Sequence, residues 1–406
     1  MKKSISRIIP GLIVMILMLG IFSCTSQPQI KTLIVTGQNN HNIGGSSVAI
    51  KTILEKPGIF TVVTATSPQK GEDMSEFIID FSPFDVVVLN YNGDDWPEET
   101  RENFVTFVEN GGGVVVIHAA NNAFPDWKEY NEITGLGGWG ERDESAGPYL
   151  YVKDGEVISD DAEGRGGSHG QKHEFIVEAF QPGHPVMKGL PARWMHAEDE
   201  LYQQLRGPAK NIEILATAYA SKEIGGTERN EPVLFTVSYG EGRIFHTVLG
   251  HTNGNEFFAP SMECAGFITI LQRGTEWAAT GKVSQKVPDI FPDETKSISW
   301  KYFEPMDIKI ISERIQDYEI GKSTNCIIAL KEQINLNLND NVKMDEIHEM
   351  ILDVLSSGSA SIEGKKILLK EFSWVATDTY KPVYEKLSTV PDLKDEALFA
   401  LEQMSY

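Results

Sequence analysis

Three histidines of this sequence stand in or next to the ends of apolar runs, where reactive groups are most easily placed. His118 directly follows a run of glycines and β-branched residues, His251 ends the run Val-Leu-Gly-His, and His41 lies in a Gly/Asn-rich loop after another run. An imidazole titrates near neutral pH and can serve as a general acid, a general base or a metal ligand. The alternative for His118 is a core histidine held by a backbone hydrogen bond.

A parallel sheet would bring these histidines together, and the sequence predicts one. Uninterrupted apolar runs alternate with helical patterns, which is typical of strands buried on both faces. Ligands of such sheets bind at the carboxyl ends of the strands. The predicted strands are residues 32–37, 60–65, 84–91, 114–119, 174–179, 213–218, 233–239 and 243–250, and the predicted helices are 46–56, 97–113 and 262–280.

Other reactive side chains lie between these runs. The segment HAEDELYQ carries three adjacent carboxylates, Glu198, Asp199 and Glu200, one of which could be a general base or a metal ligand. Trp139 lies in the aperiodic stretch 120–172, where its face could stack on a sugar or pack a lid.

The pair His169 and His173 has the spacing of a metal motif, but Gly170 separates them and a strand follows, so it is not a helical metal pair. A divalent metal such as zinc, held by several histidines from different loops, stays an open alternative. We expect His118 to face the crevice near at least two of His41, His173, Glu200 and His251.

Several short motifs resemble the trehalose-utilisation (ThuA-like) family over residues 31–280. They are TLIVTG with a histidine after it, GGGVVVIHAANNAF, GHPVMKGLP, DELY and YGEGRIFHTVLGH. The resemblance implies a class I glutamine amidotransferase-like fold, which is a flavodoxin-like parallel sheet with helices on both faces. Glutaminases of that fold carry a nucleophilic cysteine at the turn where this chain has His118. Without that thiol, glutaminase chemistry is excluded.

The family is associated with the use of sugars, including keto-glycosides, so the resemblance implies a small carbohydrate ligand. We expect an enzyme that acts on a glycoside or keto-sugar by acid–base chemistry; the alternative is a non-catalytic sugar-binding lipoprotein. The expected catalytic residues are His118, Glu200 and His173. The expected substrate-binding residues are His41, Asn121, Trp139, His169, Asp199, Tyr202 and His251.

The amino-terminal residues predict export. A basic start precedes the apolar segment 8–22, which is short for a membrane span and is followed by Ser23 and Cys24. This pattern resembles a bacterial lipoprotein signal, residues 1–23, with lipidation of Cys24, a tether over 24–30 and a location in the cell envelope facing the periplasm. An ordinary cleaved signal peptide is the alternative.

The composition changes after the predicted ThuA-like domain, residues 31–281. Residues 282–406 read as a linker and short amphipathic helices, either a HEAT-like module or a plain helical cap, which could dock a protein partner. A formal net charge of −22 makes nucleic acid a poor partner. Cys264 and Cys326 lie in different predicted domains, so we expect free, buried thiols.

Overall fold

Strand and helix alternate in the first part of the chain, as the apolar runs predict. This computed structural model describes residues 29–253, 259–300, 306–320, 325–338 and 340–404. Helix α1 begins where the Asn42 side chain accepts a hydrogen bond from the backbone of Gly45, and α2 begins after Pro97 with Glu98 and Glu99 in its first turn. The elements are β1 (Ile30–Thr36), α1 (Ile43–Glu55), β2 (Phe60–Thr66), β3 (Val86–Leu89), α2 (Glu98–Glu109) and β4 (Gly113–Ile117).

The main sheet is mixed, with the strand order β2-β1-β3-β4-β13-β12-β11-β8-β9 and the hairpin β5–β6 paired to β12. Neighbours from β2 to β13 are parallel, and those from β13 to β9 are antiparallel. The later strands are β5 (Tyr149–Lys153), β6 (Glu156–Asp160), β8 (His173–Ala179), β9 (Arg193–Asp199), β11 (Ile212–Tyr219), β12 (Asn230–Tyr239) and β13 (Gly242–Thr247).

The α/β prediction is therefore confirmed as a mixed sheet: the strands from β2 to β13 are parallel, as expected, and those from β13 to β9 are antiparallel, while the flavodoxin-like topology stays a prediction. The tight turn at Gly240, whose φ is +56°, joins β12 directly to β13. A connection that short permits only antiparallel pairing, because parallel strands need a long crossover. Strand β9 and the hairpin β5–β6 were not predicted, since their polar residues interrupt the apolar pattern.

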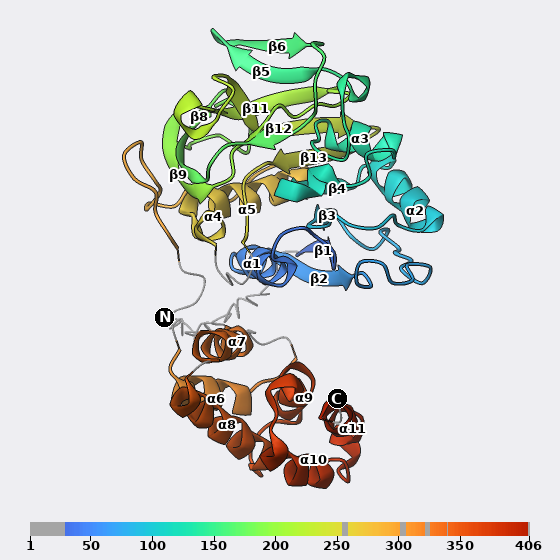
Figure 1. Cartoon of the computed structure of the whole chain (residues 1–406), viewed down its shortest axis with the longest axis vertical. Helices are drawn as coiled ribbons and strands as arrows, with labels where there is room; N and C mark the ends of the chain where they lie inside the picture. Colours follow the sequence, from blue (N-terminus) through green and yellow to red (C-terminus); the bar gives the residue numbers. More distant parts are fainter. Residues whose placement is uncertain (1–28, 254–258, 301–305, 321–324, 339, 405–406) are drawn as a thin grey trace, which may run out of the picture.

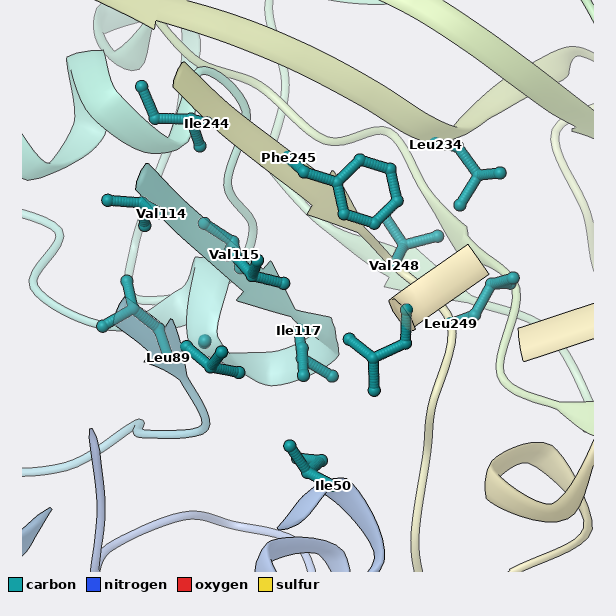
Figure 2. Close-up of a cluster of buried hydrophobic side chains, with 14 of the residues drawn as sticks. Ile50, Leu89, Val114, Val115, Ile117, Leu234, Ile244, Phe245, Val248 and Leu249 are labelled. Atoms are coloured by element: carbon teal, nitrogen blue, oxygen red, sulfur yellow. The ribbon is translucent and has the colours of Figure 1, made fainter. Parts of the chain in front are cut away.

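Helices cover both faces of the sheet (Figure 1). Adjacent residues of a strand point to opposite faces. Phe245 of β13 would contact any side chain placed at Gly274 of α5 (Ala265–Thr280), while His246 reaches the carbonyl oxygen of Thr134 in α3 (Lys128–Thr134). Figure 2 shows Ile117, Leu249 and Ile50, from a strand, a loop and α1, gathered in the core.

The aperiodic stretch 120–172 is ordered by two buried arginines rather than by an amphipathic pattern. The Arg142 guanidinium donates to the carbonyl oxygens of Asn122, Ala123, Gly138 and Trp139. Arg206 donates to carbonyl oxygens between residues 147 and 164. Side chains thus satisfy backbone groups that regular structure would otherwise pair. The stretch also contains the 3-10 turns η1 (His118–Asn122) and η2 (Glu144–Ala146) and strand β7 (Ser168–His169), which pairs with β10 (Tyr202–Gln203).

The helix expected over 262–280 is broken at Cys264, whose extended backbone separates α4 (Pro260–Glu263) from α5. The predicted C-terminal helical region is confirmed. Its helices enclose a second hydrophobic core, while Ile328 of α7 joins the first. They are α6 (Ile308–Gln316), α7 (Asn325–Asn337), α8 (Asn341–Ser356), α9 (Ile362–Glu371), α10 (Lys381–Leu387) and α11 (Lys394–Gln403).

Both described cysteines, Cys264 and Cys326, are free and buried, as expected. The predicted signal segment 1–23 and Cys24 lie outside the described residues. Within the described part of the chain, none of the helices has the length and apolarity needed to cross a membrane. The domain boundary at residue 281 and a HEAT-like repeat stay predictions.

Candidate metal centre

Four side chains from four separate segments converge at the carboxyl end of the parallel strands. His41 follows β1, His118 follows β4, Glu200 follows β9 and His251 follows β13. One ligating atom from each lies within 4.8 Å of the others. We call these four residues the His–Glu cluster. The expectation that His118 lies near at least two of the named partners is confirmed with three of them.

His118 enters the cluster through an unusual backbone turn. Its φ is +46°, in the left-handed region that L residues rarely adopt. The ring is 3% exposed, and its Nδ1 lies 2.6 Å from the carbonyl oxygen of Val248. Because a carbonyl only accepts, Nδ1 carries the proton and Nε2 presents a lone pair. That Nε2 is buried, has no hydrogen-bond partner among the described residues, and lies 3.8 Å from Oε2 of Glu200.

His251 is oriented in the same manner by its other nitrogen. Its Nε2 lies 2.7 Å from Oδ1 of Asn253, so with the amide assigned this way Nε2 donates and Nδ1 presents a lone pair. Nδ1 lies 3.1 Å from Oε2 of Glu200, yet no aligned hydrogen bond reaches it within the described structure. The His41 ring completes the group, with its centroid 4.9 Å from that of His118 and 4.5 Å from that of His251.

The electrostatics of the cluster favour neutral rings at His41 and His118 and an ionised carboxylate at Glu200, whereas His251 holds a proton more readily. Burial, and then the neighbouring His118 and His251, lower the pKa of His41 to about 3. Burial also lowers the pKa of His118. The pKa of Glu200 is lowered, because His251, His118 and His169 together outweigh its burial. Burial acts to lower the pKa of His251, but Glu200 and Asn253 outweigh it and the pKa is raised.

A pocket of about 510 Å³ opens onto this cluster. Tyr202 stacks on His118 with ring centroids 4.2 Å apart, and Trp139 lies 4.6 Å from Tyr202. His169 stands at the rim with its Nε2 3.8 Å from Oε1 of Glu200. The lining residues are aromatic, amide-bearing or small in the main: Asn40, His41, Asn92, Gly93, Asn122, Phe124, Pro125, Trp139, Gly140, His169, Glu200 and Tyr202.

Three residues expected at the site lie elsewhere. His173 begins β8, bonds through Nδ1 to the Gln171 carbonyl and packs on Phe175, outside both cluster and pocket. Asn121 is fully buried and its amide meets Nε2 of His246, so the direct substrate contact expected of it is not supported. Asp199 is also fully buried, beneath the cluster, with no surface left for a substrate.

Other residues of the pocket were not predicted from the sequence. The amides of Asn40, Asn92 and Asn122 line it, and they stand beside or within loops that follow strands, which is the signal that could have identified them. Phe124 forms another wall, with a φ of +48°. His196, fully buried on β9, was also missed; its Nε2 lies 2.8 Å from Oδ2 of Asp199.

Comparisons with known proteins agree with the resemblance in the sequence. The family model ThuA, described as trehalose utilisation, matches residues 31–278. A crystallised ThuA-like protein from Parabacteroides merdae is 55% identical, covers 68% of this chain and 98% of its own, and has a TM-score of 0.66. A ThuA-like protein from Bacteroides uniformis is 20% identical over 63% of this chain and 94% of its own, with a TM-score of 0.42. No curated protein matches the chain.

Proposed function

Because the chain belongs to the ThuA family, described as trehalose utilisation, we propose that it acts on a sugar with the help of a divalent metal ion held by the His–Glu cluster. The substrate would be a neutral glycoside or keto-sugar. One observation carries this proposal: two buried imidazole nitrogens, of His118 and His251, lack hydrogen-bond partners in the described structure and converge with Glu200 and His41.

The donor set fits a transition metal such as zinc. Three imidazoles and one carboxylate are ligands that zinc prefers, and a catalytic zinc ion keeps a position for substrate, which four protein donors leave when the ion expands to five ligands. In metal-binding histidines the N–H of the other ring nitrogen donates a hydrogen bond to an oxygen atom. Here Nδ1 of His118 donates to the Val248 carbonyl oxygen, and Nε2 of His251 donates to Oδ1 of Asn253. An unsatisfied buried group costs about 1–3 kcal/mol, a cost that a bound ion would remove. His118 is thereby reassigned from a general acid or base to a ligand.

The surrounding residues would bind and orient the sugar. Trp139, Phe124 and Tyr202 offer aromatic faces to the apolar face of a pyranose ring, and the amides of Asn40 and Asn92 can bond its hydroxyls. None of the described lining residues is Lys or Arg, which supports a neutral substrate rather than a phosphorylated one.

Proton transfer would fall to His169 at the rim. A bound divalent ion would polarise a carbonyl or hydroxyl oxygen of the sugar. The half-exposed His169 can exchange protons with solvent, and its Nε2 faces Oε1 of Glu200 at 3.8 Å. This position allows it to donate or accept a proton at a substrate hydroxyl held between the two.

The activity test is a screen of zinc-loaded protein against keto-glycosides and ordinary disaccharides, with and without a chelator. We expect turnover of at least one neutral sugar, lost on chelation and restored by zinc. Turnover that resists the chelator would contradict the role of the metal. Binding of a sugar without any turnover would favour the alternative, a non-catalytic sugar-binding lipoprotein.

The location is proposed separately, from the sequence. The basic start, the apolar segment 8–22 and Cys24 support a lipid anchor in the cell envelope. In Cys24→Ser the anchor cannot form, so the protein should be released or stay unprocessed. Membrane association and processing like those of the wild type would contradict the anchor.

A further inference from the structure

Asp199 is a fully buried carboxylate that lies next to the His–Glu cluster without belonging to it. Its Oδ1 accepts hydrogen bonds from the backbone N–H groups of Glu200, at 2.8 Å, and His251, at 3.0 Å. Its Oδ2 accepts from the backbone N–H of Gly250 and from Nε2 of His196, both at 2.8 Å. One side chain therefore bonds to the backbone of two of the four cluster residues.

The sheet itself does not fix the distance between these two residues. Glu200 follows β9 and His251 follows β13, and the strands β12, β11 and β8 lie between β13 and β9 in the sheet. Within the described structure, no ladder hydrogen bonds connect the two strand ends. The Asp199 carboxylate supplies that connection directly, through three backbone N–H groups from the two segments.

Further hydrogen bonds fix the positions of Asp199 and His251. His196 is fully buried, and its Nε2 is the only side-chain donor that the described structure gives to this carboxylate. Around His251, Ser261 of α4 donates its hydroxyl to the His251 carbonyl oxygen at 2.5 Å. Gly250 has a φ of +110°, a conformation that favours glycine and aims its N–H at Asp199.

The buried pair of Asp199 and His196 is a poor source of net stability, because the loss of hydration offsets most of the attraction between two buried charges. We therefore explain the presence of this pair by the position that it gives to the Asp199 carboxylate. Groups that orient the ligands of a metal typically change metal affinity about 10- to 100-fold when they are removed. Asp199 acts on ligands from two segments at once.

We propose that Asp199 is a positioning residue, which sets the separation of Glu200 and His251 for metal binding without touching the metal or the substrate. This inference rests on the proposed function, since it needs a metal at the His–Glu cluster. It replaces the substrate-binding role that the sequence suggested for Asp199.

The test is a titration of the full chain with Co²⁺, followed by its visible absorption spectrum. Asp199→Asn keeps the size of the side chain but replaces one acceptor oxygen by an amide that cannot accept from the backbone. We expect Co²⁺ affinity to fall about 10- to 100-fold and the absorption bands to shift as the coordination changes. The matched control is Glu198→Gln, which removes an exposed carboxylate from the preceding position and should leave affinity and spectrum unchanged.

A second variant covers the case in which Asp199→Asn does not fold. His196→Gln keeps a neutral donor but loses the imidazole, so it should weaken Co²⁺ binding by a smaller factor and shift the same bands. Wild-type affinity and spectrum in every folded variant would overturn the role of Asp199 alone. Failure of the wild type to bind Co²⁺ would overturn the proposed function, and this inference with it.

Discussion

Two neighbouring regions of the sheet each bury an imidazole, and only one of them has the features of a reactive site. His118 follows β4, and His246 lies inside β13, the adjacent parallel strand. Each ring is buried, each places Nδ1 against a backbone carbonyl, and burial lowers the pKa of each. Nε2 of His246 lies 3.1 Å from the Asn121 amide, whereas Nε2 of His118 has no such partner in the described structure.

The difference shows which property distinguishes a candidate functional histidine from a structural one. Burial and a lowered pKa are shared by both rings, so neither identifies function. The distinguishing feature is a buried lone pair that the protein leaves unsatisfied and directs toward other titratable groups, since buried polar atoms are nearly always paired. His246 behaves as a satisfied core residue, and His118 as a ligand.

The largest expected effect concerns His118. In His118→Asn the shorter amide can keep the hydrogen bond to the Val248 carbonyl but does not reach the position of Nε2, so the cluster loses one donor. We expect turnover of any sugar substrate to fall by about 10²-fold or more while the fold is kept, because a bound ion would supply several kcal/mol of charge stabilisation and each 1.36 kcal/mol corresponds to tenfold in rate. Turnover and melting temperature should be measured on the same sample. Unchanged turnover with a lowered melting temperature would place His118 with His246 as a core residue.

Metal removal gives the next largest effect. An ion present at about 100 times its Kd stabilises the folded state by about 2.7 kcal/mol, which corresponds to about 5–10 °C in the melting temperature of a domain of this size. A thermal scan with zinc or with a chelator should reveal that difference in wild type and in His246→Asn, but not in His118→Asn. If zinc still raised the melting temperature of His118→Asn, His118 would not differ from His246 in its contribution to metal binding.

A stability loss of about 1–3 kcal/mol is expected for His246→Asn, since the shorter side chain leaves the Thr134 carbonyl or the Asn121 amide unsatisfied. Denaturant unfolding at pH 7.5 measures this loss. Zinc affinity should stay at the wild-type value, because His246 contributes no atom to the cluster. A weakened zinc site with full stability would contradict the structural role.

His246 should also make the free energy of unfolding depend on pH, by a comparable or smaller amount. Burial lowers the pKa of His246 to about 3, so the folded protein keeps the ring neutral while the unfolded chain binds a proton below its usual pKa of about 6.5. The free energy of unfolding of the wild type therefore has its full contribution from His246 above pH 6.5. This contribution decreases as the pH falls, by about 2 kcal/mol at pH 5. The stability difference between wild type and His246→Asn should therefore shrink at pH 5. An equal difference at pH 5 and 7.5 would contradict the buried neutral state.

The smallest effect is expected at the pocket wall. Trp139→Ala removes one aromatic face, and a stacking contact of about 0.5–1.5 kcal/mol corresponds to a KM about 2- to 10-fold higher with kcat retained. Trp374, an exposed tryptophan of the C-terminal helical region, provides the matched control, and its replacement by alanine should leave KM unchanged. A loss of kcat in Trp139→Ala would mean that the residue supports the cluster rather than the sugar.

Much of the cluster could be predicted from the sequence, because three of its residues stand at or near the ends of apolar runs. His41, His118 and His251 follow parallel strands, and the carboxyl ends of such strands share one edge of the sheet. Glu200 was also expected there, as the one of three adjacent carboxylates that was assigned a catalytic role, but the strand pattern gave no support for that choice. The segment that ends in β9 has no clean alternation, so the sequence could not show which of the three carboxylates points to the site.

The failures have physical causes as well. His173 begins β8 opposite Asp199, at the same edge of the sheet as the cluster. Its ring nevertheless bonds to the Gln171 carbonyl and packs on Phe175, an orientation that no local pattern encodes. Asn121 and Asn122 are adjacent, but the 3-10 turn after His118 buries the former and exposes the latter to the pocket. The role of Asp199 depends on backbone groups 51 and 52 residues away in the chain, which spacing alone cannot reveal.

The central claim is that the His–Glu cluster holds one divalent metal ion, and anomalous X-ray scattering tests it most directly. Crystals of the wild type grown with zinc should show one anomalous peak at the zinc edge, about 2.0–2.2 Å from a nitrogen of His41, His118 and His251 and from an oxygen of Glu200. The same peak should be absent from crystals of His118→Asn. A wild-type crystal without a peak at the cluster, or an equally strong peak in the variant, would contradict the account.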